Sequence, residues 1–109
     1  MEKYLSIYLT TPACRSLISA NGIVGINMSA VNTVKIWYKE GKTITLTLSA
    51  NMAANDNSVA NLLSDEIAKL HADSSYESYT TGISVIPTPL DRTEDAAGAD
   101  VTITSMTIA

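Results

Sequence analysis

Few residues of this chain have side chains that could support covalent chemistry. The chain has one cysteine, Cys14, and one histidine, His71. A thiol becomes a nucleophile when an imidazole within hydrogen-bond reach takes its proton and a third group orients that imidazole. No recognisable motif surrounds either residue, so we interpret Cys14 as a small buried apolar side chain and His71 as a boundary residue late in a helix. One cysteine cannot form an internal disulfide.

Two acidic segments carry the oxygen ligands that Ca²⁺ prefers. Asn55–Asp56–Asn57 resembles part of a calcium-binding loop, but the glycine and the distal glutamate of such a loop are missing from the required positions. We therefore interpret this segment as a helix cap. The second segment is an acidic loop over residues 87–99, where we favour a solvated loop over a cation site; the acids concerned are Asp91, Glu94, Asp95 and Asp100. We predict no metal and no cofactor.

Charge and motifs both disfavour nucleic-acid recognition. Seven basic and eleven acidic side chains give a net charge of −4 at pH 7, the wrong sign for a nucleic-acid groove. Gly22-Ile-Val-Gly25 matches the tetrad of a KH loop, but the basic residues and flanking helices of that motif are missing. No phosphate-cradling loop, Ser/His/Asp signature or long apolar run occurs. We expect a protein that is not an enzyme and binds neither nucleic acid nor membrane.

The composition predicts the elements that must position any site. A length of 109 residues suits a single domain, 1–109, and 46% hydrophobic with 17% charged residues is typical of a folded chain. Thirteen threonines and twelve serines favour a sheet with one face in water. We predict an α+β fold: a mainly antiparallel sheet of five or six strands with one amphipathic helix packed on one face.

Three strands are predicted near the N-terminus. The first, Lys3–Leu9, turns its leucines and Ile7 to one side and its two tyrosines to the other. A short strand, Arg15–Ser19, and a longer one, Gly22–Met28, follow. Gly25 indicates a bulge or a close backbone approach in the longer strand. The apolar residues expected to share one face of that strand are Val24, Ile26 and Met28.

Thr33–Lys39 and Lys42–Ser49 form the clearest hairpin. A two-residue loop would mix polar and apolar residues on each face of the hairpin. A three-residue loop pairs Ile36 with Ile44 and places the apolar residues on one face and the polar residues on the other. Gly41 then comes last in the loop, where a type I turn followed by a bulge needs a left-handed residue. The opposite, threonine-rich face then carries Lys35, Trp37, Thr43, Thr45 and Thr47.

One helix and two strands complete the prediction. The helix spans about Asn57–Ala72, with an apolar stripe at helical spacing. A short strand, Gly82–Ile86, precedes the acidic loop, and Val101–Ile108 closes the chain as a strand. The apolar phase of this last strand slips, which indicates a bulge near Ser105.

The order of these segments carries a resemblance. The strand MEKYLSIYLT is followed by LISANGIVGINMSAVNTVKIWYKEGKTITLTLSA, the helix SVANLLSDEIAKL and an apolar C-terminal strand. Over about residues 1–86 and the last eight residues, this pattern is similar to small virion-associated structural proteins of tailed, marine-type bacteriophages. Leu90–Ala99 looks like an insertion. The resemblance implies a capsid decoration or cement protein, or a small head or tail component, in a symmetric oligomer such as a trimer.

We therefore expect a virion structural protein, made in the host cytoplasm, that acts through protein–protein contacts. Its partners would be the major capsid protein or another virion component, and further copies of itself. Aromatic and basic side chains on a threonine-rich face are typical of an interface, so the expected contact residues are Tyr4, Tyr8, Lys35, Trp37 and Thr45. Two alternatives stay open: a small host-directed inhibitor or regulatory binding module absent from the particle, and a small enzyme that uses Cys14 or the acidic loop.

Overall fold

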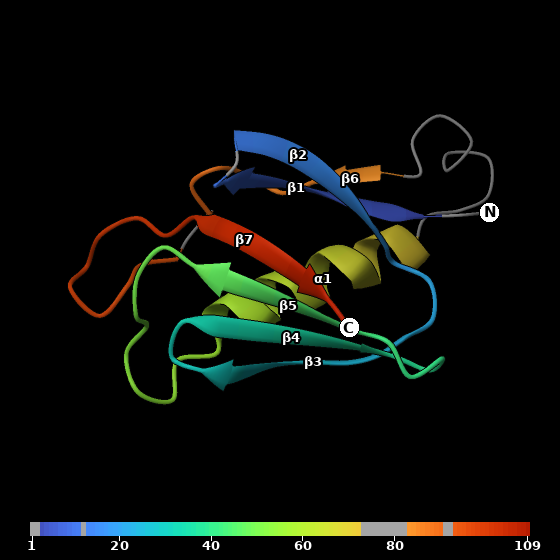
Figure 1. The fold of residues 1–109 in the computed structure, drawn as a ribbon, viewed down its shortest axis with the longest axis horizontal. Coiled ribbons are helices and arrows are strands. Elements are labelled where there is room, and N and C mark those ends of the chain that lie inside the picture. Colours follow the sequence, from blue (N-terminus) through green and yellow to red (C-terminus); the bar gives the residue numbers. More distant parts are fainter. Residues whose placement is uncertain (1–2, 12, 73–82, 91–92) are drawn as a thin grey trace.

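The computed structural model describes residues 3–11, 13–72, 83–90 and 93–109. Within these ranges the chain forms seven strands and one helix (Figure 1). In chain order they are β1 (Tyr4–Thr10), β2 (Ala13–Ser19), β3 (Ile23–Ala30), β4 (Thr33–Tyr38), β5 (Thr43–Leu48), α1 (Ser58–Ala72), β6 (Ile83–Val85) and β7 (Ile103–Ile108).

The strands form one sheet in the order β2-β1-β7-β5-β4-β3, and β6 lies off this path beside β1. Four neighbouring pairs are antiparallel. The first half of β1 pairs in parallel with β6, and its second half pairs in parallel with β7 at Leu9 and Ile103. The predicted α+β class and mostly antiparallel sheet are confirmed. The described part has seven strands, more than the five or six expected, because β6 and β7 share one edge of β1.

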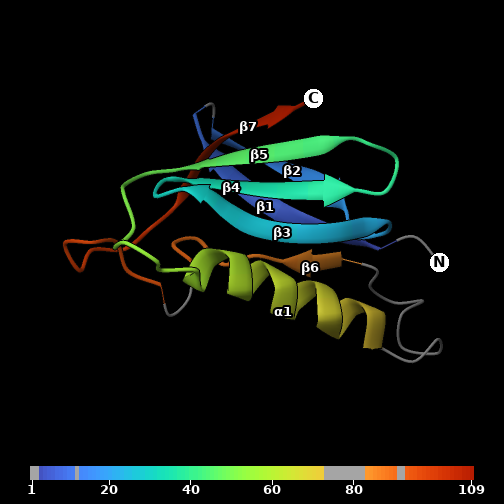
Figure 2. The same ribbon diagram turned by 90° about the horizontal axis from the view of Figure 1, so that it is seen from below.

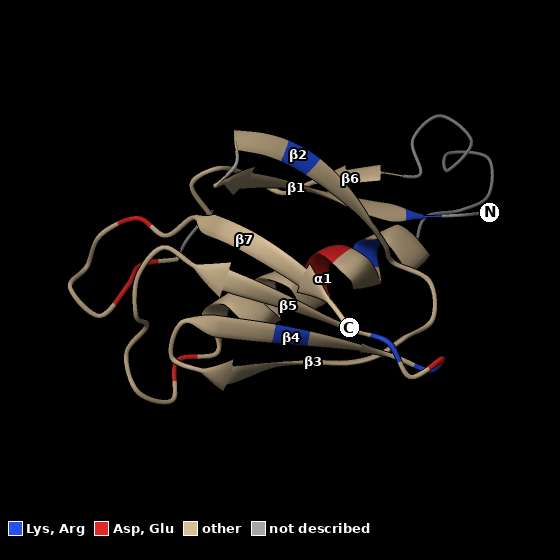
Figure 3. Cartoon of the chain, in the orientation of Figure 1, with Lys and Arg blue, Asp and Glu red and all other residues tan. Residues whose placement is uncertain are grey.

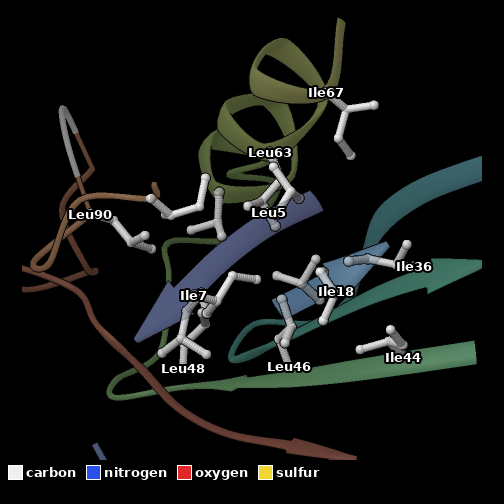
Figure 4. Packing of buried hydrophobic residues seen from close by; sticks show 14 of the residues in the cluster. Leu5, Ile7, Ile18, Ile36, Ile44, Leu46, Leu48, Leu63, Ile67 and Leu90 are labelled. Carbon is white, nitrogen blue, oxygen red and sulfur yellow. The ribbon is translucent and has the colours of Figure 1, made fainter. Parts of the chain in front are cut away.

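The core lies between the sheet and α1, which runs along one side of the sheet (Figure 2). The apolar stripe of α1 faces the strands, and Leu63 is fully buried beside Leu5 (Figure 4). Each such side chain stabilises the fold by about 1.5–3 kcal/mol through removal of its surface from water. Among the described residues no helix is long and apolar enough to cross a membrane. The core also contains Ile7, Val34, Ile36, Leu46, Val59, Ile86 and Val101.

The hairpin between β4 and β5 has the predicted register. Ile36 faces Ile44, and Val34 faces Leu46. The backbone N–H of Gly41 donates to the Tyr38 carbonyl over 3.0 Å, and Gly41 has a φ of +93°. The three-residue loop is therefore confirmed, and with it the assignment of alternate residues to opposite faces of the sheet.

The bulge predicted at Gly25 is confirmed, but the predicted face of Val24 is wrong. The register between β3 and β4 shifts between Ile23 and Gly25. Because a bulge adds one residue to a strand, the residues before it change face. Ile23 therefore packs against the core together with Ile26, whereas Val24 is 66% exposed.

A second predicted irregularity explains the slipped phase of β7. Ser105 faces Thr47, but the next pair joins Ile103 to Leu48, so Thr104 is the additional residue on β7. The Thr104 hydroxyl donates to the Thr47 carbonyl over 3.0 Å. The bulge keeps Ile103 in the core although its spacing from Met106 breaks the alternation.

Both ends of α1 are fixed by polar contacts. Asp56 accepts hydrogen bonds from the backbone N–H of Ser58 over 2.9 Å and from its hydroxyl over 2.6 Å, so Asp56 is the predicted cap. These bonds lower the pKa of the Asp56 carboxyl. At the other end, the buried Lys3 ammonium donates to the carbonyl of Leu70, where a positive charge complements the helix dipole.

The sheet curves around this core. The Tyr38 hydroxyl, on β4, donates to the Ser19 carbonyl at the end of β2 over 2.6 Å, although three strands separate β2 from β4 in the sheet order. Burial, and next the charge of Glu40, raise the pKa of Tyr38. This hydrogen bond connects β4 to the end of β2 on the side of the sheet that faces the core.

Candidate interaction face

The side of the sheet that faces away from the core carries the residues expected to form a contact surface. We call this surface the outer sheet face. Alternation along each strand decides which residues belong to this surface. Its members either alternate with buried residues along one strand or pair directly with another member on the neighbouring strand. The outer sheet face consists of Tyr4, Ser6, Tyr8, Arg15, Leu17, Lys35, Trp37, Thr43, Thr45, Thr47, Ile83, Val85, Ser105 and Thr107.

Three of the five predicted contact residues lie together on β4 and β5. Lys35 faces Thr45 directly, and Trp37 is two residues further along β4. All three side chains are half-buried. Gly25 on β3 faces Trp37, and a Cβ there would lie 3.9 Å from the indole Cε3. The indole therefore lies against the backbone of Gly25, where no side chain intervenes.

The other two predicted contact residues, Tyr4 and Tyr8, lie on β1 and are half-buried. The Arg15 guanidinium carbon lies 5.8 Å from the centroid of the Tyr8 ring, within the range of a cation–π contact. The same guanidinium donates to the Ser6 carbonyl over 3.3 Å and to its hydroxyl over 3.4 Å. Arg15 therefore lies across β1, with its charge on the outer sheet face.

The five residues share one face but not one cluster. In the sheet order, β7 and β5 lie between β1 and β4. Three steps between neighbouring strands amount to about 14 Å, so the tyrosines of β1 are too far from Trp37 to touch it. The strip between the two groups carries hydroxyl side chains, namely Thr43, Thr45, Thr47, Ser105 and Thr107.

Two members of this face on β2 and two on β6 depend on strand pairing that the sequence does not show. Arg15 and Leu17 share a face by alternation, but their place beside β1 depends on the pairing of Tyr8 with Arg15 and of Ser6 with Leu17. Ile83 and Val85 join the face because β6 runs parallel to β1, and no local signal predicts that pairing. The exposed fractions are 56% for Leu17, 44% for Ile83 and 58% for Val85, so these side chains add an apolar area beside Tyr4.

The outer sheet face is basic, although the whole chain carries a net charge of −4. None of the seven strands contains an acidic residue, and the only charged residues in them are Arg15 and Lys35. Figure 3 shows the acids of the described residues on α1 and on connecting segments, most of them at one end of the molecule. The fold therefore keeps the acids of the described residues off the outer sheet face.

Cys14 and His71 do not form a nucleophile pair. The Nε2 atom of His71 lies 2.8 Å from the Ala20 carbonyl, so this nitrogen donates a hydrogen bond to the backbone. Ala20 is six residues from Cys14 along an extended strand, a separation of about 20 Å. The interpretation of Cys14 as buried is wrong, because Cys14 sits exposed at the start of the edge strand β2.

The described residues of the acidic loop over residues 87–99 are mostly exposed, but the loop is attached to the rest of the chain at several points. Asp91 lies outside the described residues. On either side of it, Leu90 is 4% exposed, and Glu94 pairs with Asp100 across an isolated bridge. Within the described ranges no group of three or more His, Cys, Asp or Glu side chains lies close enough to hold a metal ion.

Two hollows flank α1 on the other side of the molecule. One, of about 460 Å³, is lined by Leu62 and polar residues of α1 together with Pro87 and Thr93. The other, of about 300 Å³, lies between β3 and α1 and contains His71 at its edge. Comparison of the chain with protein-family models, with curated proteins and with solved structures finds no match.

Proposed function

We propose that this chain is a non-enzymatic structural protein of a tailed-bacteriophage virion, a capsid decoration or cement protein that acts through protein–protein contacts. The observation that carries the proposal is the outer sheet face. It combines Trp37 and Tyr8 with the basic side chains Lys35 and Arg15. Tryptophan, tyrosine and arginine are the residue types that contribute most to binding energy in interfaces.

The packing of α1 supports this use of the sheet. The amphipathic helix covers one face, and its buried residues belong to the core that the strands form. The opposite face is left with half-buried aromatic rings and with exposed Leu17 and Val85. Apolar side chains collected on one exposed face are typical of a surface that a partner covers.

The placement in a particle is supported by the resemblance in element order to small virion-associated phage proteins. A decoration protein binds the repeated sites of a shell, where several copies acting together give high avidity from modest single contacts. We expect a symmetric oligomer, a trimer, with the major capsid protein or another virion component as partner. The contact residues proposed on this face are Tyr4, Tyr8, Lys35, Trp37 and Thr45.

Mass spectrometry of purified phage particles tests the proposal. The copy number of the chain is measured relative to the major capsid protein. Copies in the hundreds support a decoration or cement role, and a handful of copies moves the proposal to a vertex, neck or tail component. Complete absence from particles refutes the virion role and favours a host-directed binding module.

A further inference from the structure

The absence of acidic side chains from the strands restricts what the outer sheet face can bind. Its charged side chains are Arg15 on β2 and Lys35 on β4, and it has no acidic residue. If two copies met through this face, the basic groups of both would enter the same contact. Like charges in an interface are unfavourable, so a symmetric face-to-face dimer is disfavoured. The face instead complements a surface that carries carboxylates.

A surface of that kind exists on the same chain. We call residues 93–100 the acidic turn. This turn projects from the left end of the molecule in Figure 3, in the segment that precedes β7. Its side chains include the exposed Glu94 and Asp100. Exposed methyl groups stand between these two acids, on Ala96, Ala97 and Ala99.

The acidic turn is held by hydrogen bonds from its backbone N–H groups to the Asp95 carboxylate and to the segment after β5. Asp95 accepts hydrogen bonds from the N–H groups of Ala97 and Ala99 over 2.8 and 2.9 Å. The Ala96 N–H donates to the Asn51 carbonyl over 2.9 Å, which anchors the turn to the segment after β5. A preformed protrusion loses little conformational entropy when it binds.

We propose that the outer sheet face receives the acidic turn of a second copy of this chain. The contact joins two different surfaces, so each copy offers one of each and the association is head-to-tail. Such contacts close into a ring when the rotation between copies allows it. A three-membered ring would be the trimer of the proposed function. This inference rests on the proposed function for the use of the face as an interface, and it names the occupant.

Sedimentation velocity of the purified protein tests the inference. The full chain is compared with R15E/K35E, which reverses the face, and with E94K/D100K, which reverses the turn while leaving Asp95 and its hydrogen bonds intact. We expect each double variant to weaken self-association by at least about ten-fold, because the favourable charge contact between face and turn becomes repulsive. We also expect 1 M salt to weaken the wild-type association, since it shortens the Debye length to about 3 Å.

Two further variants separate a specific contact from general charge effects. The control K42E/K69E has the same formal net charge as R15E/K35E, −8 from −4 with two reversals, and changes exposed lysines outside the outer sheet face. We expect K42E/K69E to associate like the wild type. The fourfold variant R15E/K35E/E94K/D100K exchanges both surfaces and returns the net charge to −4, so it should recover the wild-type oligomer.

The outcomes distinguish this inference from the proposed function. Loss in both double variants, with recovery in the fourfold variant, supports head-to-tail association. A wild-type monomer at all concentrations refutes the inference, as does an oligomer that neither salt nor the double variants affect. Either result leaves the virion role to be decided by the particle measurement. Conversely, a salt-sensitive oligomer absent from particles would uphold the inference and refute the virion role.

Discussion

Replacement of Gly41 by alanine tests whether the turn between β4 and β5 requires a residue in the left-handed conformation. Gly41 has a φ of +93°, a conformation that side chains bearing a Cβ rarely adopt. A Cβ built on Gly41 would meet no atom within 4 Å. The substitution therefore changes backbone strain and nothing else in the folded state.

The expected cost follows from this geometry. An L-residue in a left-handed conformation loses about 1–2 kcal/mol relative to glycine. We expect G41A to lower the free energy of unfolding by that amount, which corresponds to a fall in Tm of about 4 °C or more for a chain of this size. Urea and thermal unfolding followed by circular dichroism measure both quantities.

Gly25 provides the matched control. It lies in β3 without a positive φ, and an added Cβ would make an ordinary contact of 3.9 Å with the Trp37 ring. We expect G25A to be neutral or slightly stabilising, because alanine reduces the entropy of the unfolded chain by about 0.4–1 kcal/mol. If G41A is as stable as wild type, or if G25A costs as much as G41A, the turn does not require a left-handed residue at position 41.

Three further perturbations have defined outcomes. Asp56→Ala should lower the free energy of unfolding in urea by about 1 kcal/mol, while Asp56→Asn, which still caps the helix, costs little. Because the pKa of Asp56 is lowered in the folded state, its stabilising contribution is present above the unfolded pKa of about 3.9 and is lost as the pH falls through the folded value. Asp56→Asn should lack this pH dependence. Leu63→Ala should cost about 2–5 kcal/mol, and the half-buried Leu62→Ala clearly less, so equal losses would contradict the core described here. Trp37→Ala should weaken assembly by at least about tenfold, while Asn61→Ala, at an exposed position of α1 outside the outer sheet face, has little effect. Unchanged assembly state and particle retention in Trp37→Ala would remove the role given to that ring.

The contact residues could be predicted only in part, and the reason is visible in two strands. Lys35 and Trp37 were placed on the outer face because the β4–β5 register follows from local alternation and from Gly41. Arg15 was not recognised, because its meeting with Tyr8 depends on how β2 returns along β1. Local patterns specify which side of a strand a residue occupies, and partner strands specify its neighbours.

The sequence by itself determined the elements and most of their faces, Val24 being an exception. Period-two alternation predicted the strands, and the apolar stripe predicted the helix. The broken phase of the last strand predicted its bulge, and the glycine within β3 indicated a bulge or a close backbone approach, of which the structure contains the bulge. These features depend on residues close together in the chain, whose spacing alone decides what can be buried.

The tertiary structure alone decided the order of the strands and therefore the composition of the outer sheet face. The parallel placement of β6 beside β1 brings Ile83 next to Tyr4, and the insertion of β7 between β1 and β5 separates the tyrosines from Trp37. Pairing between distant segments depends on which strand edges remain free and on how the curved sheet closes over α1. Nothing within a single strand encodes that choice, because each strand offers the same backbone donors and acceptors to any neighbour.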